Sequence, residues 1–299
     1  MSNVKTKNNK IKYVLWILLL LFAIIIVNEL RKSLFFRNPE RINILIYNKY
    51  PTVYSLGLKD KINYKINFYP DLKIEIPGGY GLYRVGAIGK LVKLEKKPDI
   101  FKKTFSLVTF SFVDYYFFPL TDEIYYGNES ENPENQTKLA SMFFFKSNAN
   151  FFDRLYLLLV FYPRRNSDFT KLELINGVNS DKDRVLLVDD LYKSFLGYFY
   201  RSQYRQEKQN LQLVYSNNYQ TASALSRIIE GNGIRVVDIG WGKLDNKIGC
   251  LVIGETDKFS QTAKDLSDFF KCQLKKGRTE VSDIIFNLNN VEKEWEINQ

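Results

Sequence analysis

Residues 211–240 read LQLVYSNNYQTASALSRIIEGNGIRVVDIG, and the pattern of this stretch decides the fold class. It opens with a short apolar run, which is typical of a buried strand. Ala222, Leu225 and Ile229 then recur at the spacing of one helix face, and the Gly-Asn-Gly that follows is typical of a helix end. A second apolar run at 234–239 returns as a strand. The stretch therefore predicts a strand, a helix and a second strand.

The same pattern repeats further along the chain. An apolar run at 248–253 predicts a third strand, Asp257 starts a second helix, and 283–288 predicts a fourth strand. When the two helices are aligned, they share the string T-A-x-x-L-S, which begins at Thr221 and again at Thr262. Two strand–helix–strand halves in series give a βαββαβ domain, an α+β sandwich of one sheet and two helices.

The cysteine and histidine content excludes several kinds of site. The chain has 299 residues, two cysteines and no histidine. Ser-His-Asp triads, Cys-His dyads, His-ligated zinc, Cys₄ zinc and disulfide-scaffold folds are therefore excluded. Cys250 falls in the third predicted strand and Cys272 late in the second helix. We expect both to be buried small hydrophobic residues rather than a disulfide pair.

Residues 13–30 predict an N-terminal transmembrane helix that acts as a signal anchor. The stretch YVLWILLLLFAIIIV, from Tyr13 to Val27, carries no charge, and the whole segment spans about 27 Å as a helix. A cleaved signal peptide is the alternative, but no A-x-A cleavage pattern follows. Since the short basic tail at 1–12 is a poor candidate for translocation, we expect a cytoplasmic N-terminus and extracytoplasmic main domains.

Beyond the anchor the chain falls into further segments by composition. We expect a tether at 31–40, an α/β unit at 41–200, a charged connector at 201–210, the βαββαβ domain at 211–290 and a tail at 291–299. Within the α/β unit, apolar runs predict strands at 43–47, 63–70, 72–76 and 112–118. Pro98 and Asp99 predict the start of a helix over 98–108, and the Pro-Gly-Gly-Tyr-Gly at 77–81 predicts a turn.

The 211–290 stretch resembles the C-terminal domain appended to many LytR-CpsA-Psr (LCP) cell-envelope proteins. The resemblance rests on LQLVYSNN, on TASALSRIIEGNGIRVVDIG and on the second βαβ half. Family members have an Asn-Gly-Thr-Gly turn where this chain has Ser216, Asn217 and Asn218. The 41–200 unit resembles a reduced form of the family's main domain, with KIEIPGGYG and the Val-Asp-Tyr-Tyr at 113–116 in matching places.

The resemblance implies an enzyme that moves a phosphate-linked polymer from a polyprenyl carrier to the cell wall. Such chemistry needs a divalent cation, Mg²⁺ or Mn²⁺, held by carboxylates, and arginines that clamp a diphosphate. Only Asp71, in the Tyr-Pro-Asp string, stands at an acidic position of the family. Asn48 and Lys49 replace the aspartate that the family has after its first strand.

The phosphate-binding candidates are all arginines. Arg84 opens the Arg-Val-Gly-Ala string that stands where the family has Lys-Ile-Asn-Ala. Arg154, Arg164 and Arg165 are further candidates, with surface or tether charges as the alternative interpretation. Asp71 is the candidate catalytic residue, and the missing positions leave open whether the protein is an active enzyme.

These observations favour a membrane-anchored, extracytoplasmic cell-envelope protein that binds or scaffolds cell-wall polymer or polyprenyl-phosphate intermediates. One alternative is an active phosphotransferase, rebuilt around Asp71 and Arg84, that attaches a glycopolymer from a polyprenyl-diphosphate carrier to the wall. The second is a membrane-bound transcriptional regulator. No helix-turn-helix, RNP-like or zinc signature is present, so nucleic acid is not an expected partner. The oligomeric state stays open.

The distribution of charge supports a partner near the membrane. The net charge is +10, and residues 31–120 alone carry 16 Lys and Arg against 7 Asp and Glu. The excess positive charge therefore lies in the segments that flank the predicted anchor and in the following α/β unit. Membrane lipid headgroups or a diphosphate carrier are the expected anionic partners.

Overall fold

The computed structural model describes residues 3–119, 123–126, 144–178, 184–243, 249–255 and 258–297. Its contacts divide the chain into two compact units. The first unit consists of Met1–Pro39 with Ala149–Arg164, and the second of Glu40–Asn148 with Arg165–Gln299. Helices and several sheets occur together in the second unit, which confirms the predicted α+β class.

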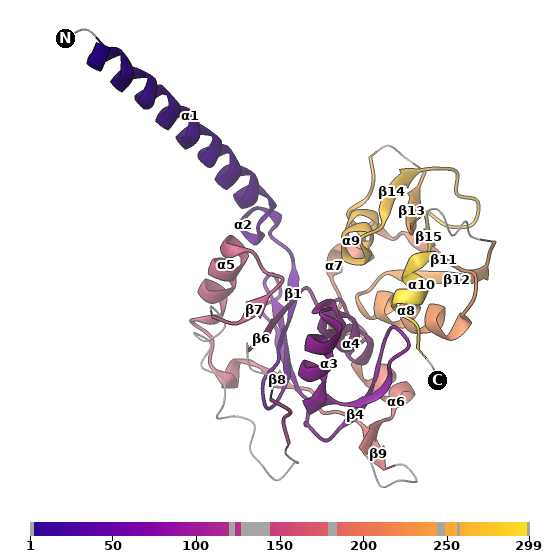
Figure 1. Cartoon of the computed structure of the whole chain (residues 1–299). Coiled ribbons are helices and arrows are strands. Elements are labelled where there is room, and N and C mark those ends of the chain that lie inside the picture. Colours follow the sequence, from indigo (N-terminus) through magenta and orange to yellow (C-terminus); the bar gives the residue numbers. More distant parts are fainter. Residues whose placement is uncertain are drawn as a thin grey trace. The chain divides into compact units, whose positions relative to one another are not determined.

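The first unit is helical (Figure 1). It contains α1 (Asn3–Lys32), α2 (Leu34–Arg37) and α5 (Phe151–Phe161). Ser33 separates α1 from α2, and both its backbone N–H and its hydroxyl donate to the Leu30 carbonyl oxygen, at 3.1 and 2.6 Å. Within the part of the chain that the structure describes, no helix combines the length and the hydropathy of a membrane crossing.

The first sheet of the second unit has six strands in the order β7-β6-β1-β2-β3-β8. These strands are β1 (Arg41–Ile46), β2 (Thr52–Gly57), β3 (Asn63–Asn67), β6 (Tyr115–Phe118), β7 (Lys146–Ser147) and β8 (Thr170–Lys171). Every residue of β1 and β2 is buried, as expected for strands covered on both faces. The strands predicted at 43–47 and 112–118 are confirmed as β1 and β6.

A second sheet and several helices complete this first lobe, which we call the pocket lobe. The sheet has the order β5-β4-β10-β9. Its strands are β4 (Lys73–Ile76), β5 (Gly81–Arg84), β9 (Asn176–Val178) and β10 (Arg184–Leu186). The described helices are η1 (Val85–Ala87), α3 (Ile88–Glu95), α4 (Asp99–Thr109), η4 (Asn166–Asp168) and α6 (Val188–Phe195). α4 confirms the predicted helix at 98–108, and buries Phe101 and Phe105 in the core. The predicted turn at 77–81 is also confirmed, with positive φ at Gly78 and Gly79.

The C-terminal lobe is a five-stranded sheet with helices, in the order β12-β11-β15-β13-β14 (Figure 1). Its elements are β11 (Asn210–Tyr215), α8 (Tyr219–Gly231), β12 (Arg235–Trp241), β13 (Leu251–Gly254), α9 (Gln261–Phe270), β14 (Gln273–Lys276), β15 (Ile284–Asn287) and α10 (Asn290–Glu294). The predicted four-strand βαββαβ order is wrong in one respect. α9 leads into an edge strand, β14, and β15 then inserts between β11 and β13. The predicted helix start at Asp257 lies outside the described residues.

Helices α8 and α9 of this lobe bury the repeated string in the same way. Thr, Ala and Leu of each copy are fully buried, and the large apolar residues that end each copy are buried too. Each helix also has a side-chain N-cap: Asn218 accepts from the Thr221 N–H at 3.1 Å, and Ser260 accepts from the Ala263 N–H at 3.1 Å. The shared string therefore marks two helices that pack alike against one sheet.

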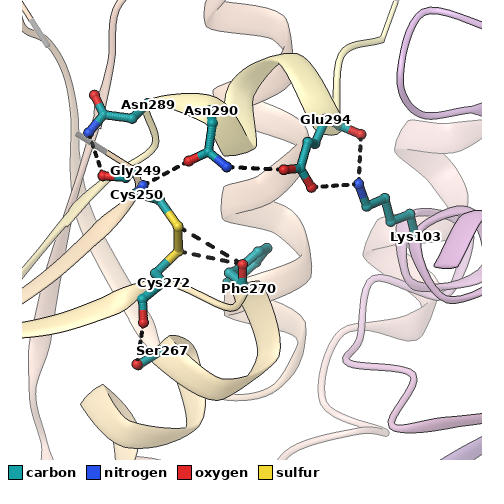
Figure 2. Close-up of a disulfide and its surroundings, with 9 residues drawn as sticks. All are labelled: Lys103, Gly249, Cys250, Ser267, Phe270, Cys272, Asn289, Asn290 and Glu294. Carbon is teal, nitrogen blue, oxygen red and sulfur yellow. Dashed lines mark hydrogen bonds and ion pairs between the residues drawn. A yellow bond between two sulfur atoms is a disulfide. The ribbon is translucent and has the colours of Figure 1, made fainter. Parts of the chain in front are cut away.

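Cys250 and Cys272 form a disulfide, which corrects our expectation of two unpaired cysteines (Figure 2). Both are buried, as expected, but their Cα atoms lie 4.9 Å apart. The physical reason is the unpredicted strand β14. Leu251 and Gln273 are partners in the parallel pairing of β13 with β14, so the residues before them are cross-strand neighbours.

The segment between the two lobes of the second unit is structured and partly buried. It contains α7 (Ser202–Glu207), preceded by Arg201. The Arg201 guanidinium donates to both carboxylate oxygens of Asp114, each at 2.9 Å, and to the Tyr204 hydroxyl at 3.2 Å. Tyr204 in turn donates to Asp265 of α9 at 2.7 Å. This network joins Asp114, directly before β6, to α7 and α9 across the junction of the two lobes.

Candidate functional site

A pocket opens at the carboxyl ends of the parallel strands β1 and β6. Ile44 pairs with Tyr115 and Ile46 with Phe117, and the N–H of Tyr47 donates to the Phe117 carbonyl oxygen at 2.8 Å. In sheets with parallel strands, ligands commonly bind beyond these carboxyl ends. We call this cavity the β1–β6 pocket.

The β1–β6 pocket has a volume of about 550 Å³, within the range of small-molecule sites. Its walls are mainly aromatic and apolar, and charged side chains stand among them. The lining residues are Tyr47, Gly89, Val92, Lys93, Lys96, Pro98, Phe118, Pro119, Glu123, Tyr125 and Lys146.

Tyr47 forms a fixed wall of the pocket. Its hydroxyl donates to the Val85 carbonyl oxygen at 3.0 Å and accepts from the Gly89 N–H at 2.8 Å. Its ring packs on Phe101 with centroids 4.5 Å apart. Burial raises the pKa of Tyr47 well above its ordinary value, although the Gly89 N–H opposes the shift. The residue that directly follows β1 is therefore a neutral, fully bonded phenol and not a carboxylate.

Two glycines allow this wall to form. A Cβ on Gly89 would lie 2.9 Å from Cε1 of Tyr47, and a Cβ on Gly86 would collide with the Tyr125 carbonyl oxygen. The Tyr125 N–H also donates to the Gly86 carbonyl oxygen at 3.0 Å. The glycines let both tyrosines lie directly on the start of α3. This close approach gives Gly86, in the Arg-Val-Gly-Ala string, a structural role.

Three lysines give the pocket its charge. Lys93 lies in the last turn of α3, Lys96 is its C-cap in the left-handed conformation with φ 54°, and Lys146 lies on the edge strand β7. All three residues are exposed, and Glu123 is the acidic residue of the lining. Cations beside an aromatic wall suit a ligand that combines an anionic group with an apolar one.

The residues predicted from the sequence lie elsewhere. Asp71 lies between β3 and β4, where one of its carboxylate oxygens is 3.8 Å from Arg184. Arg84 is the exposed last residue of β5. Neither residue lines the β1–β6 pocket, so the pocket is built without them.

The other three arginines are distributed over both units. Arg154 and Arg164 belong to the helical first unit, and Arg165 begins the next stretch of the second. Nε of Arg154 donates to the Ala149 carbonyl oxygen at 3.2 Å, and Arg164 donates to the Val160 carbonyl oxygen. The N–H of Arg165 donates to Asp168 at 2.8 Å. None of the three lines the pocket.

The described residues do not fit the Mg²⁺ or Mn²⁺ site that a phosphotransferase would need. Among them, no group of three or more acidic or cysteine side chains stands close enough together to hold a metal ion. Asp71 is paired with a cation and not with a second carboxylate. We therefore derive no reaction step through a metal.

Sequence reasoning missed the three pocket lysines. Lys93 and Lys96 fall in a lysine-rich stretch that has the composition of a helix end, and Lys146 is 50 residues further on. A weak signal was available in that lysine cluster beside Pro98. Only the pairing of β1 with β6, and of β6 with β7, brings the third lysine to the same pocket.

Comparisons with known proteins leave the chain without an assigned family. No protein-family model matches it, and no curated protein matches it. Solved structures similar to it include Bacillus subtilis TagV, with a TM-score of 0.35 and 9% identity over 52% of this chain and 94% of that one. The B. subtilis transcriptional regulator yvhJ has a TM-score of 0.36 and 10% identity, over the same shares of the two chains.

A transcriptional regulator from Enterococcus faecalis is similar at the same distance, with a TM-score of 0.34 and 10% identity over 52% of this chain and 84% of that one. At TM-scores below 0.5, these likenesses assign neither a fold nor a function.

Proposed function

We propose that this chain is a membrane-anchored, extracytoplasmic protein of the cell envelope that binds an anionic, lipid-linked wall intermediate in the β1–β6 pocket. The observation that carries the proposal is the combination of Lys93, Lys96 and Lys146 with an aromatic wall in one cavity. A polyprenyl phosphate or diphosphate has the matching chemistry, with an anionic head for the lysines and an apolar chain for the wall.

The surface of α1 supports the anchoring part of the proposal. The eight consecutive residues from Leu15 to Phe22 are apolar and all exposed. Eight residues cover more than two helical turns, so no face of this stretch packs on protein. A helix that is apolar on every side needs an apolar environment, and a lipid bilayer is one that suits it.

The disulfide supports an extracytoplasmic location. Disulfides form and persist in oxidising compartments, and they are rare in the cytosol. Cys250 and Cys272 are both buried and pair across neighbouring strands, so the bond fits the fold without rearrangement. A chain with this C-terminal lobe outside the membrane agrees with the predicted cytoplasmic N-terminus.

The end of β1 supports binding without phosphotransfer. The family that the sequence resembles has an aspartate after its first strand, whereas this chain has Asn48 and Lys49 there, directly after the hydrogen-bonded Tyr47. An active phosphotransferase built around Asp71 remains the alternative. A transfer assay from a polyprenyl-diphosphate sugar with Mg²⁺ or Mn²⁺ separates the two. Metal-dependent turnover that Asp71→Ala abolishes would overturn the binding-only function.

The binding experiment uses the detergent-solubilised full chain and three probes: farnesyl diphosphate, farnesol and inorganic diphosphate. Isothermal titration calorimetry should give tightest binding for farnesyl diphosphate, because only this probe offers both the anionic head and the apolar chain. The triple variant Lys93→Ala, Lys96→Ala, Lys146→Ala should weaken that binding by about tenfold or more.

The matched control removes the same charge from the C-terminal lobe, with Lys243→Ala, Lys264→Ala and Lys275→Ala, all exposed. Its affinity for farnesyl diphosphate should stay near that of the unaltered chain. An equal loss in both triple variants would show attraction by net charge alone and would contradict a site at the β1–β6 pocket.

The membrane topology has its own test. Reporters that fluoresce only inside or only outside the cytoplasm, fused to the C-terminus, should report an extracytoplasmic end. A cytoplasmic C-terminus would overturn the proposed location, whatever the pocket binds.

A further inference from the structure

Helix α5 has two faces of opposite character. Residues spaced by four along one face, Asp153, Leu157 and Phe161, are buried. The opposite face is apolar and exposed. It consists of Phe151, Leu155, Leu159 and Tyr162, with 62%, 37%, 60% and 91% of their surface accessible. A helix that turns its apolar residues outward has the reverse of the pattern expected on a water-facing surface.

The buried side of α5 is fixed to the segment that directly follows α1. The Asp153 carboxylate accepts from the Leu34 N–H at 2.8 Å and lies 3.8 Å from Arg37. The ring of Phe35 stands edge-on to that of Tyr156, with centroids 5.1 Å apart. α5 is thus held against α2 by a buried carboxylate and an aromatic pair.

The exposed apolar surface continues onto α2. Phe35 and Phe36 are both exposed, Phe36 at 63%. Phe36 is four residues beyond Lys32, the last residue of α1, so at most about 14 Å of chain separates them. If α1 crosses a bilayer, this surface lies within a headgroup layer's reach of the lipid.

The charges of the same unit suit that position. Arg31, Lys32 and Arg37 stand at the end of α1 and on α2, and Arg154 and Arg164 belong to the α5 segment. The acidic residues of these two segments are Glu29 and the buried Asp153. Arginines that border exposed aromatic and leucine side chains are typical of a helix lying in the membrane interface.

We propose that the outer face of α5, together with Phe36 of α2, lies in the headgroup region of an anionic phospholipid bilayer. Phe36, Phe151, Leu155, Leu159 and Tyr162 enter the boundary between headgroups and acyl chains, and the arginines contact lipid phosphates. This inference rests on the membrane anchoring proposed above. It gives two of the predicted phosphate-binding arginines, Arg154 and Arg164, a lipid partner in place of a diphosphate substrate.

The experiment places one fluorophore at a time on the full chain. Because both native cysteines are in a disulfide, an introduced cysteine supplies the reactive thiol. Leu159→Cys reports the α5 face, Leu20→Cys reports α1, and Leu94→Cys on α3 is a matched exposed leucine of the second unit. Each is labelled with an environment-sensitive nitrobenzoxadiazole and reconstituted in phosphatidylethanolamine–phosphatidylglycerol vesicles that contain a nitroxide-labelled lipid.

We expect the nitroxide to quench the label at residues 20 and 159 several-fold more than at residue 94. Quenching at 20 without quenching at 159 would overturn the α5 inference and leave the anchor standing. Quenching at 159 alone would support the inference and remove the anchor. No quenching at either position would overturn both.

A second measurement tests whether a second copy of the chain, and not lipid, covers the outer face of α5. A blue-shifted label at residue 159 that the nitroxide does not quench, together with disulfide-linked dimers of the unlabelled Leu159→Cys chain, would place a second copy there and overturn the inference. The triple variant Phe151→Ser, Leu159→Ser, Tyr162→Ser keeps the buried face of α5 and should lose quenching of a label at Leu155→Cys.

Discussion

The pocket lobe and the C-terminal lobe differ in which groups accept hydrogen bonds from the backbone N–H groups at the starts of their helices. In the C-terminal lobe, α8 and α9 both have side-chain N-caps, and each helix start also meets a glutamate from elsewhere in the chain. Glu292 accepts from the N–H groups of Ser216 and Asn217 at 2.9 and 2.7 Å. Glu207 accepts from the Gln261 and Thr262 N–H groups, both at 2.9 Å.

The pocket lobe is arranged differently. α3 and α4 have no side-chain N-cap hydrogen bond, and exposed lysines stand at the end of α3 beside a cavity. In the C-terminal lobe the anion-binding positions at helix starts are filled by the protein's own carboxylates. The pocket lobe therefore has exposed lysines beside a cavity, whereas the helix starts of the C-terminal lobe are already bound by carboxylates of the chain itself.

The largest effect is expected where the two lobes meet. Arg201→Ala leaves the Asp114 carboxylate, which is mostly buried, without its bidentate partner. Breaking such a pair should lower the free energy of unfolding by about 4 kcal/mol, measured by urea denaturation. Arg205→Ala, an exposed arginine stacked 4.2 Å over Tyr200, is the control and should cost less than about 1 kcal/mol. Equal losses of unfolding free energy in the two variants would show that Arg201 at the junction contributes no more to stability than the exposed Arg205.

The disulfide tests whether the C-terminal lobe can be destabilised without an effect on the pocket lobe. It links residues 22 positions apart, so Cys250→Ser with Cys272→Ser should lower the free energy of unfolding by about 3 kcal/mol. Fluorescence of Trp295, which packs on Phe269 and Phe270, reports unfolding of this lobe. The reduced native chain should match the variant, and farnesyl diphosphate binding should be retained. Loss of binding on reduction would break the division between the lobes.

Glu292 tests the self-filled helix start. Glu292→Ala removes the carboxylate that the turn at 216–218 donates to, and should lower the free energy of unfolding by about 2 kcal/mol. Glu294→Ala on the same helix breaks an exposed pair with Lys103 and should cost less than about 1 kcal/mol. Thermal unfolding followed by circular dichroism compares the two variants. A similar melting temperature in both would remove the role of Glu292.

The smallest effect is a pH dependence at the lobe junction. Burial lowers the pKa of Lys102 from 10.5 to about 8, against the opposing carboxylates of Asp114 and Asp99. Below pH 8 both folded and unfolded states are protonated, so the cost of burying the charge is fully present. As pH rises from 8 toward 10.5 the folded state loses its proton first, and the free energy of unfolding rises.

We expect a gain of about 1 kcal/mol between pH 7.5 and 9.5 after allowance for solvent screening. The pH range of this measurement ends at 9.5 because tyrosines ionise near pH 10 in the unfolded state. Lys102→Met should remove the gain, while Lys103→Met, at the neighbouring position of α4, should keep it. Denaturation curves at each pH check this, and an unchanged slope in Lys102→Met would contradict the assignment.

The local sequence pattern predicted many of the helices and strands but missed a strand at the edge of a sheet. Apolar runs and helix-end residues predicted β1, β11, β12, α4 and α8, because a buried strand or an amphipathic helix has a recognisable spacing of apolar residues. β14 was missed because its sequence, QLKK, has one apolar residue, as expected for an exposed edge strand. The wrong expectation for Cys250 and Cys272 followed from that omission.

The candidate site was the least predictable part. Asp71 and Arg84 were chosen because neighbouring residues in the sequence resemble a family motif, and local likeness carries no information on which strand ends meet. The pocket depends on β1 and β6 lying parallel, although residues 44 and 115 are far apart in the chain. Lys146 joins the pocket through a further pairing of β6 with β7.

The sequence by itself determined the α+β class, most of the buried strands and helices, the repeat and the charge-free apolar run, since each depends on the chemistry of neighbouring residues. Tertiary structure decided the disulfide, the two glutamates at helix starts and the lysine-bordered β1–β6 pocket. Each of these joins residues from separate elements, and long-range pairing in a sheet is fixed by the packing of the whole lobe rather than by any local pattern.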